Sequence, residues 1–262
     1  MRKELTPAEV KEIQLDILIK IHRFCISRGL RYSLGGGTLL GAVRHKGYIP
    51  WDDDVDIMLP RPDYIRLINE FHDECLTVQN LHTDNHYYLL LTKIYDNRTT
   101  FMQNGYMGGV FIDVFPIDGL PEESEAKEYL KKQNDIKEQI WRATKTYQFS
   151  ENRFLNFIKY VLRQVVYGFP NRNILIQKYE ALYSQYDFDT SPFAGAITGP
   201  YGMKEFMGAS VFKEYISLPF EGHDFYCIKE YDAYLKKHYG DYMQLPPKEQ
   251  RVPHHIEHIF WR

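Results

Sequence analysis

The sequence has few cysteines, no long apolar run and no excess of positive charge, and each of these absences excludes a class of protein. Its three cysteines form no CxxC pair, which argues against a disulfide framework or a zinc site. No window approaches the roughly 18 apolar residues of a membrane-spanning helix, and the first residues lack the apolar stretch of a signal peptide. The net charge of −3 provides no basic surface for nucleic acid. We therefore expect a folded cytoplasmic protein that does not bind nucleic acid.

Helical and strand patterns alternate in the first part of the chain. Thr6, Pro7 and Glu9 form a capping box ahead of apolar residues at helical spacing, which predicts a long helix that ends at Gly29. A glycine-rich turn then precedes a short helix, predicted to start near Thr38 and to stop at Gly47. Strands are predicted at residues 54–59, 76–80, 88–95 and 109–117, and a helix is predicted at 60–75.

The later part of the chain has a different pattern. Helical runs are predicted near residues 123–147, 152–168 and 171–186. The stretch "SLPFEGHDFYCI" predicts a hairpin that turns at Glu221 and Gly222, and "KEYDAYLKKHYG" predicts a helix that ends at Gly240. We therefore expect one domain, residues 1–262, in three parts: an α/β core at 1–120, a mainly helical segment at 121–190, and C-terminal strands, helix and tail at 191–262.

The stretch "WDDDVDIML" concentrates carboxylates at the start of a predicted strand. Like charges at this spacing repel one another, so the fold needs something that compensates them. Because side chains alternate along a strand, Asp54 and Asp56 should point to one side and Val55 into the core. Two adjacent carboxylates suit Mg²⁺, which takes a few oxygen ligands from the protein and the rest from water and substrate phosphates.

Two further features belong with this pair. Asp113 lies inside the apolar strand "FIDVF", where a shared metal ion would give it a partner, although a carboxylate satisfied at a strand end is an equal alternative. The glycines at 35–37 precede a helix, where backbone N–H groups approach phosphate oxygens closely, although such a triplet also serves as a plain tight turn. Together the features indicate metal-assisted phosphoryl transfer.

The segments "GGGTLLGAVRHKGYIPWDDDVDIMLPR", "GVFIDVFPIDGLP" and "YGDYMQLPP", with a later "HH", resemble the LicD family, whose members transfer phosphocholine or a related phospho-group onto cell-surface glycans. The resemblance implies an α+β fold with a nucleotidyltransferase-like mixed β-sheet flanked by helices, and a helical insertion. It assigns the family's glycine turn to Gly36 and Gly37, its Asp-x-Asp to Asp54 and Asp56, and its third carboxylate to Asp113. The turn and the acid pair lie further apart here than in many nucleotidyltransferases.

The resemblance also implies a reaction. Phosphocholine, or a similar phospho-alcohol, would pass from a CDP-linked donor such as CDP-choline to a sugar hydroxyl of teichoic acid, lipopolysaccharide or capsule, with release of CMP. Mg²⁺, or alternatively Mn²⁺, held by Asp54, Asp56 and Asp113 would neutralise the diphosphate, and Asp113 is a candidate to take the hydroxyl proton. The alternatives are a nucleotidyltransferase or sugar-phosphate transferase on the same scaffold, and a non-catalytic glycan-binding protein. The intact set of three aspartates argues against the last.

The candidates for substrate binding are Gly36, Gly37, Thr38, Arg44, Lys93, His254 and His255. The glycines with Thr38 would cradle the donor phosphates, while Arg44 and Lys93 would stabilise charge in the transition state. Arg44 equally suits an exposed helix end, Lys93 a strand residue that reaches the surface, and the histidines a plain surface role. A choline group would bind among aromatic residues, of which Trp51 lies nearest to the acids in the sequence.

Residues 141–178 carry seven basic residues and one acidic residue, interleaved with apolar ones. One interpretation is a helix that faces the core and has a basic outer side. The other is peripheral contact with the anionic inner face of the plasma membrane, where a lipid-linked glycan acceptor would be presented.

Overall fold

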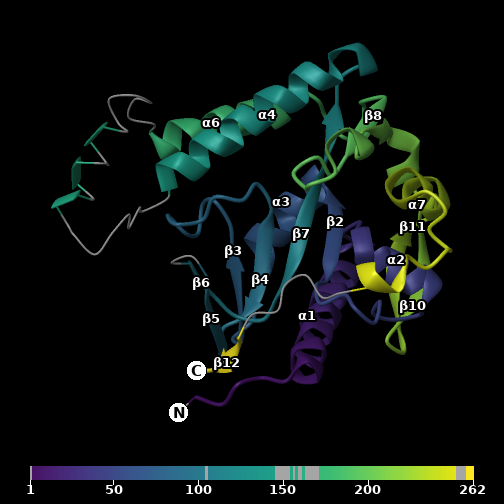
Figure 1. Cartoon of the computed structure of the whole chain (residues 1–262). Coiled ribbons are helices and arrows are strands. Elements are labelled where there is room, and N and C mark those ends of the chain that lie inside the picture. The colour runs from purple at the N-terminus through teal and green to yellow at the C-terminus, as the bar shows by residue number, and fades with distance from the viewer. Residues whose placement is uncertain are drawn as a thin grey trace.

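The computed structural model describes residues 2–103, 106–144, 154–155, 157–158, 161–162, 171–251 and 258–262. In these parts of the chain, helices flank a mixed β-sheet, which confirms the expected α+β fold (Figure 1). The helices are α1 (Pro7–Arg28), α2 (Gly36–Arg44), α3 (Arg61–Glu70), α4 (Glu123–Thr144), α6 (Arg172–Tyr183) and α7 (Tyr231–Tyr239). The strands are β1 (Ser33–Leu34), β2 (Asp56–Pro60), β3 (Leu76–Gln79), β4 (Thr92–Asp96), β5 (Thr99–Gln103), β6 (Tyr106–Gly108), β7 (Phe111–Leu120), β8 (Phe193–Gly195), β9 (Met207–Gly208), β10 (Tyr215–Phe220), β11 (His223–Ile228) and β12 (Phe260–Trp261). Short 3₁₀ helices lie at Gly202–Lys204, Ala209–Phe212 and Lys248–Gln250.

The central sheet has the strand order β1-β2-β7-β4-β3, and β7 is its longest described strand. β2 runs parallel to β7, with Asp56 opposite Asp113, whereas β4 runs antiparallel to β7, with Lys93 opposite Asp113. The far end of β7 pairs with β8, so a strand from the C-terminal part of the chain extends the same sheet. Three charged residues on neighbouring strands are thereby placed in one row.

The elements with strong local signals form where the sequence predicts them. Thr6 caps α1 in a capping box, and Gly29 ends this helix in the left-handed conformation at a φ of 63°. Glu221 and Gly222 both adopt positive φ, at 48° and 76°, as the two-residue turn of the β10–β11 hairpin requires. Helix α7 ends at Gly240. Such signals act within a few residues of chain, so they do not depend on the rest of the fold.

Several predicted boundaries are wrong. Helix α3 ends at Glu70, although a helix was expected up to residue 75. Helix α2 starts at Gly36, two residues before Thr38, and ends at Arg44, well before Gly47. The strand expected at 88–95 is limited to β4, because residues 88–91 leave the sheet and Leu90 and Leu91 are buried outside it. Leu90 belongs to a second apolar cluster that α4 and α6 cover, and an apolar run alone cannot distinguish such packing from a strand.

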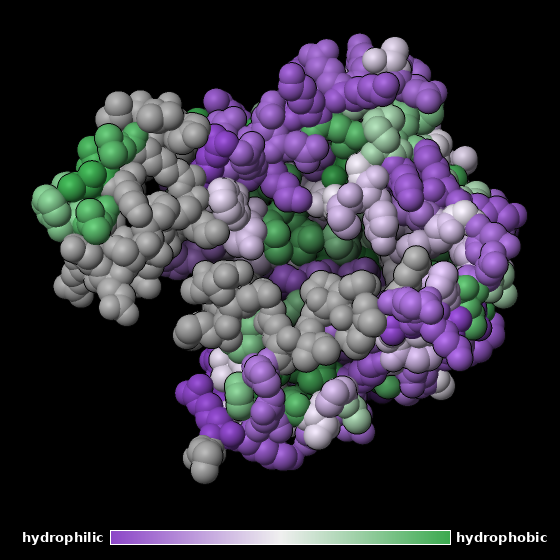
Figure 2. Space-filling view, in the orientation of Figure 1, coloured by the Kyte–Doolittle hydropathy of each residue, from purple (hydrophilic) through white to green (hydrophobic). Residues whose placement is uncertain are grey.

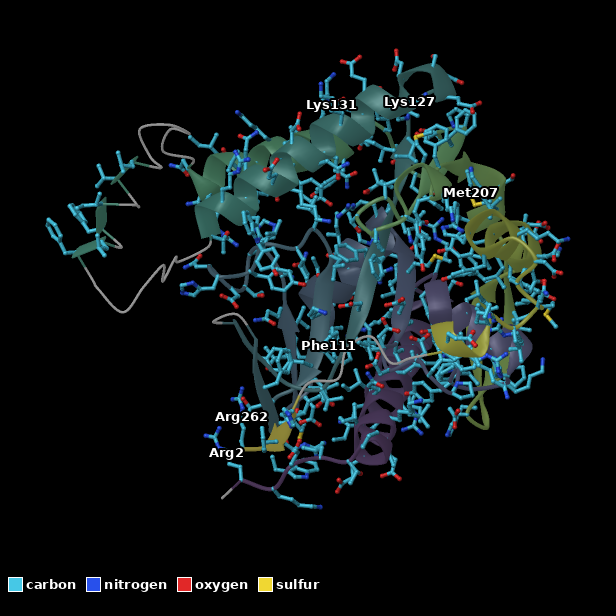
Figure 3. The ribbon with its side chains drawn as sticks, viewed as in Figure 1. Arg2, Phe111, Lys127, Lys131, Met207 and Arg262 are labelled. Carbon is cyan, nitrogen blue, oxygen red and sulfur yellow. The ribbon has the colours of Figure 1, made fainter. Side chains whose placement is uncertain are left out.

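The strands β5 and β6 were not predicted from the sequence. They pair with each other, and β12 adds from the C-terminal end of the chain. Glu4 bridges to Phe260, which brings the two ends of the chain together, and Figure 3 shows Arg2 and Arg262 near each other at the same edge of the molecule. Lys127 and Lys131 lie on the outer side of α4 in the same view.

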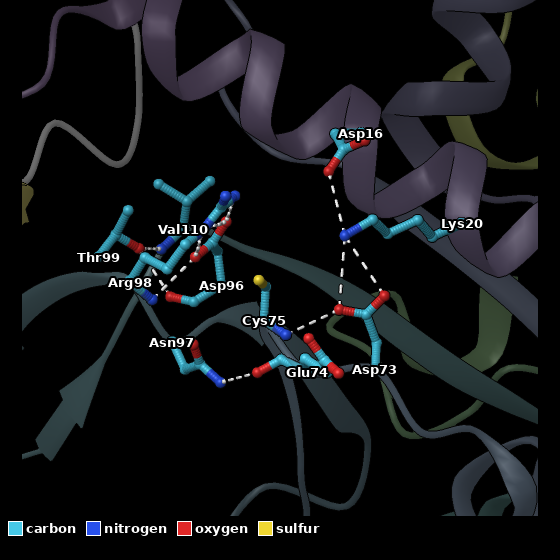
Figure 4. Close-up of polar contacts among 10 residues, drawn as sticks. All are labelled: Asp16, Lys20, Asp73, Glu74, Cys75, Asp96, Asn97, Arg98, Thr99 and Val110. Atoms are coloured by element: carbon cyan, nitrogen blue, oxygen red, sulfur yellow. Dashed lines mark hydrogen bonds and ion pairs between the residues drawn. The ribbon is translucent and has the colours of Figure 1, made fainter.

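A group of ion pairs attaches α1 to the edge of the sheet (Figure 4). Lys20 of α1 lies 3.4 Å from Asp16 on the same helix and 3.3 Å from Asp73, in the segment that leads into β3. The Thr99 hydroxyl accepts a hydrogen bond from the Val110 N–H at 2.8 Å, which joins the ends of the β5–β6 excursion. The Lys20 ion pairs thus attach α1 to the segment before β3, and the Thr99 hydrogen bond closes the β5–β6 excursion just before β7.

A buried ion pair joins three other elements. Arg61 of α3 donates two hydrogen bonds to Asp118 of β7, at 2.6 and 2.7 Å, and a third to the Tyr179 hydroxyl of α6 at 3.1 Å. The Tyr183 ring lies 4.0 Å from the same guanidinium. α4 and α6 lie side by side (Figure 1), so this pair connects the helical layer to the sheet.

The helices in the described part of the chain include no candidate for a membrane-spanning segment, because none combines the necessary length with the necessary hydropathy.

Candidate active site

A pocket of about 900 Å³ opens beside the strands β2 and β7. One acidic wall of the pocket comes from two segments that are far apart in the sequence but adjacent in the sheet: Asp52, Asp54, Asp56 and Asp113. Glu205 and Asp241 line the pocket elsewhere. Figure 3 shows Phe111 at the start of β7, two residues before Asp113. Val55 is fully buried between two residues that line the pocket, which is the alternation that the sequence predicted.

The two acidic segments are held by a helix that does not itself line the pocket. Gln14 of α1 is buried, and its Nε2 donates hydrogen bonds to the carbonyls of Asp53 at 2.9 Å and Phe111 at 3.5 Å. The Asp113 N–H also donates to the Val55 carbonyl at 2.8 Å. The backbones that carry the acids are thus fixed relative to each other before any ligand binds.

The glycine turn leaves room for these carboxylates. A Cβ at Gly36 would lie 2.9 Å from Asp56 Oδ2, and a Cβ at Gly37 would lie 2.5 Å from Asp52 Oδ2. Gly36 also has a φ of 45°, in the left-handed region. Both glycines line the pocket, so a role next to donor phosphates stays a prediction. Their need to accommodate the acids is a role that the sequence did not indicate.

Thr38 lies behind the pocket wall. It is buried in the first turns of α2, and its hydroxyl accepts a hydrogen bond from the Asp56 N–H at 2.8 Å. Among the described residues that line the pocket, Thr38 is absent. The side chain therefore positions Asp56, and its predicted contact with donor phosphates would have to come from the backbone.

The acidic wall carries excess negative charge. The pKa of Asp56 is raised well above the usual range of an aspartate, first by burial and then by the charges of Asp54, Asp113 and Asp52. The positive charge of Lys93 acts in the opposite direction. Burial also raises the pKa of Asp52, while a hydrogen bond with Asp54 lowers it. Such a wall favours the binding of protons or cations.

The chemistry of this wall fits a hard divalent cation, because carboxylate oxygens are the donors that Mg²⁺ and Mn²⁺ prefer. A cation would also relieve the repulsion that raises the pKa of Asp56. Within the part of the chain that the structure describes, no three His, Cys, Asp or Glu side chains are gathered so that they could hold a metal ion. The donors therefore fit the expected ion in kind, and their spacing would have to tighten on binding.

Lys93 supplies a positive charge at this wall. Its Nζ lies 2.7 Å from Asp113 Oδ1 and 3.3 Å from the centre of the Phe111 ring. Lys93 does not appear among the described lining residues of the pocket, so it reaches the site through Asp113. The alternative of a lysine that extends into solvent is wrong, because its side chain is 13% exposed.

Arg44 lines the pocket and holds its C-terminal side. Its NH1 donates hydrogen bonds to the carbonyls of Tyr242 at 2.7 Å and Gln244 at 3.4 Å. Burial, and then the nearby Arg251, lower its pKa. Arg44 is thus not a plain exposed helix end. His254 and His255 lie outside the described residues, so their predicted contact with substrate stays a prediction.

Trp51 lines the pocket but is already in contact with a cation. The Arg251 guanidinium lies 5.3 Å from the centre of its ring, and the His45 ring lies 6.2 Å away at 85°. The aromatic residue nearest to the acids in sequence is therefore packed against the protein's own arginine.

Another side of the pocket was not predicted from the sequence. It includes Lys137 of α4, Tyr201, Glu205 and Tyr239. Tyr239 belongs to the stretch "YGDYMQLPP", whose resemblance to the family was the one signal for this side. Tyr201 and Glu205 follow β8 and carry no motif that would mark them. Only the pairing of β8 with β7 brings them to the acids.

The chain is similar to known proteins in one family domain and, for one relative, over nearly its full length. The family model described as LicD/FKTN/FKRP, nucleotidyltransferase domain, matches residues 29–172. Over 98% of its length the chain is 33% identical to the lipopolysaccharide cholinephosphotransferase LicD of Haemophilus influenzae, of which it covers 99%. A stretch of 29 residues, 11% of the chain, is 66% identical to the human ribitol 5-phosphate transferase FKRP and spans 6% of that protein. The resemblance that the sequence motifs indicated is confirmed.

Proposed function

The chain belongs to the LicD family, and on that premise we propose that it is a phosphotransferase that moves phosphocholine from CDP-choline to a sugar hydroxyl of lipopolysaccharide, with release of CMP. The observation that carries the proposal is the gathering of Asp54, Asp56 and Asp113 on one wall of a pocket, beside a glycine turn. The near full-length similarity to a lipopolysaccharide cholinephosphotransferase supports the choice of phosphocholine and of the acceptor. Teichoic acid and capsule are alternative acceptors of the same chemistry.

We assign two roles to the carboxylates, ion binding and proton transfer. Asp54, Asp56 and Asp113 would hold Mg²⁺, or alternatively Mn²⁺, which when bound supplies charge neutralisation at the diphosphate. Lys93 Nζ lies 2.7 Å from Asp113 Oδ1 and offsets part of the negative charge of the wall. One of these three aspartates would also take the proton of the acceptor hydroxyl, and Asp113 is the candidate.

The phosphates of the donor would face the cationic lining of the pocket. Arg44 and Lys137 are the lysine and arginine side chains among the described lining residues, and they come from α2 and α4. Burial lowers the pKa of Lys137, and a phosphate beside it would act in the opposite direction. The N–H groups of the Gly36–Gly37 turn would add to this binding, since they belong to the first turn of α2.

The products test this function directly. The purified protein is incubated with lipopolysaccharide and, in separate reactions, with CDP-choline, CDP-ribitol, CDP-glycerol or CTP, each with and without Mg²⁺. We expect CMP release from CDP-choline above the other donors, together with choline on the glycan. Pyrophosphate release from CTP would identify a nucleotidyltransferase instead, and turnover of CDP-ribitol alone would move the function toward the ribitol phosphate transferases. Glycan binding without any product would indicate a non-catalytic protein.

We also propose that the protein works on the cytoplasmic side of the plasma membrane, as a peripheral protein, where a lipid-linked acceptor would be accessible. Most of residues 141–178 lie outside the described residues. The described side chains at 154–155, 157–158 and 161–162 are apolar and between 37% and 69% exposed, and Figure 2 shows them as an apolar tip of the molecule. Exposed apolar side chains at a projecting tip, within a basic stretch, suit an anionic lipid surface.

A further inference from the structure

The side of the pocket that was not predicted from the sequence includes a buried carboxylate, one oxygen of which has no hydrogen-bond partner among the described residues. Glu205 is 3% exposed, and in the described part of the chain its Oε2 has no hydrogen-bond partner. Its Oε1 lies 3.1 Å from His238 Nε2, but without the geometry of a hydrogen bond. A buried carboxylate oxygen without a partner costs free energy unless something else approaches it, and Glu205 lines the pocket where a ligand enters.

His238 is held in place by other contacts. Its Nδ1 faces the Tyr234 carbonyl at 2.8 Å and must donate to it, because a carbonyl only accepts. Its ring stacks on the Tyr234 ring with centroids 4.1 Å apart. His238 therefore cannot rotate to donate a hydrogen bond to Glu205, and Glu205 Oε2 stays without a partner among the described residues.

Aromatic rings stand beside this carboxylate. The rings of Tyr201 and Tyr239 lie 5.9 Å apart at 83°, and their hydroxyl groups are 3.0 Å apart. Both rings line the pocket together with Glu205. Burial raises the pKa of Tyr201, and the charges of Asp56 and Glu205 act in the same direction, so both acidic groups lie near this ring. A Cβ at Gly36 would lie 3.8 Å from the Tyr239 hydroxyl, so the rings adjoin the glycine turn.

The chemistry of this group selects one kind of ligand. A phosphate would be repelled by Glu205, and a polyol such as ribitol would donate hydrogen bonds to the carboxylate but bring no positive charge to neutralise it. A quaternary ammonium ion has no N–H to donate, carries a diffuse positive charge, and binds well against aromatic faces and a nearby negative charge. We propose that Glu205, Tyr201 and Tyr239 bind the quaternary ammonium group of the transferred phosphocholine and so determine which donor the enzyme uses. This inference rests on the proposed function and deepens it.

Binding measurements test the site without turnover. Tetramethylammonium, CDP-choline and CDP-glycerol are titrated into the wild-type protein and into Glu205→Gln, which keeps the shape of the side chain and removes its charge. We expect Glu205→Gln to weaken the binding of tetramethylammonium and of CDP-choline by about tenfold or more, while the affinity for CDP-glycerol is unchanged. Equal weakening of both CDP-alcohols, or no change in any, would overturn the site.

Ring variants guard against a failure to fold. Tyr201→Phe keeps the aromatic face and should retain selectivity for CDP-choline, whereas Tyr201→Leu should lose it by about tenfold, with unchanged melting temperatures for both. If Tyr201→Phe and Tyr201→Leu behave alike, the ring does not bind the cation and the proposal is wrong.

The two proposals fail in different ways. Wild-type protein that binds tetramethylammonium through Glu205 but transfers nothing from CDP-choline supports the cation site and contradicts the proposed function. Wild-type protein that transfers phosphocholine with the same donor selectivity as Glu205→Gln supports the function and contradicts the site.

Discussion

At the scale of single residues, Asp56 is the point where folding and chemistry conflict. Its N–H is held by Thr38 and its carboxylate fits against Gly36, so the backbone fixes the charge where three other carboxylates repel it. The result is a side chain with a raised pKa in a pocket, which is the usual signature of a functional acid or base. The stability cost and the chemistry therefore have the same origin.

This conflict predicts that Asp56→Asn stabilises the protein while it abolishes transfer. Because the folded-state pKa of Asp56 lies above its unfolded value, ionisation costs stability above the raised pKa, and the cost disappears as the pH falls through it. The melting temperature of Asp56→Asn should therefore exceed that of the wild type at about pH 8 without divalent ions, and the difference should shrink toward about pH 5. If the wild type melts at a higher temperature than Asp56→Asn at about pH 8, this assignment is wrong. Asp53→Asn is the matched control, with little effect expected.

The other acids should differ in their effects on turnover. Asp54→Ala, Asp56→Ala and Asp113→Ala should each lower the rate about a hundredfold or more while the protein stays folded, because each removes a group from the acidic wall. Asp52→Ala should be milder. Initial rates of CMP release, with circular dichroism as the folding control, measure both effects. If Asp52→Ala is the most damaging change, the assignment of the ion-binding acids is wrong.

At the scale of elements, the site is built by the junction of β1, the glycine turn and α2 against the start of β2. The Gly35 N–H donates to the Asp56 carbonyl at 2.9 Å, so the turn is bonded to the strand that carries the acid. A helix that begins at Gly36 places its first N–H groups beside this acid, and only residues without a Cβ leave space for the carboxylates.

Two glycines with the same backbone conformation separate strain from function. Gly29 and Gly36 both have positive φ, at 63° and 45°, but a Cβ at Gly29 would meet nothing within 4 Å. Gly29→Ala should cost about 1 kcal/mol of stability and leave the rate unchanged. Gly36→Ala should cost stability and also lower the rate about tenfold or more, because its Cβ would displace the Asp56 carboxylate. Chemical denaturation and initial rates measure the two effects, and equal rates for both variants would refute the role of Gly36.

At the scale of the whole molecule, the helical layer and the central sheet both contribute residues to the same pocket. Lys137 of α4 and Asp113 of β7 both line it, and the Arg61–Asp118 pair lies where α3, β7 and α6 meet. The arrangement of the pocket thus depends on a contact that is not part of it.

Loss of that contact should destabilise the protein strongly. Asp118→Asn removes the charge that compensates buried Arg61, and breaking a buried pair costs about 3–5 kcal/mol, or roughly 10 °C in melting temperature. Glu128→Gln, which breaks the exposed pair with Lys132 on α4, serves as the control and should leave the melting temperature unchanged. Calorimetry distinguishes the two, and similar melting temperatures would show that the buried pair contributes little.

The apolar tip should decide attachment to membranes. Replacement of Phe154 and Phe157, 69% and 63% exposed, by serine should reduce sedimentation with anionic vesicles several-fold at low salt, while turnover of a soluble acceptor is unchanged. Ile174→Ser, an exposed apolar residue of α6, is the control. Equal sedimentation of all three proteins, or none with the wild type, would contradict the membrane proposal.

The sequence by itself determined the features whose causes are local. The capping box of α1, the β10–β11 turn and the alternation of Asp54, Val55 and Asp56 each depend on neighbouring residues, and each appears as predicted. The family motif likewise lies in continuous stretches. Where the cause was burial against a distant element, as for residues 88–91, the prediction from the sequence was wrong.

Only the tertiary structure decided which distant residues share the pocket. Lys93 meets Asp113 because β4 pairs with β7, and Glu205 and Tyr201 join the acids because β8 pairs with the far end of β7. Such pairings depend on the register between strands that are many residues apart, and no periodicity in the chain records that register. The sequence therefore identified the acids that gather in the pocket, and the fold decided which cation, carboxylate and rings stand beside them.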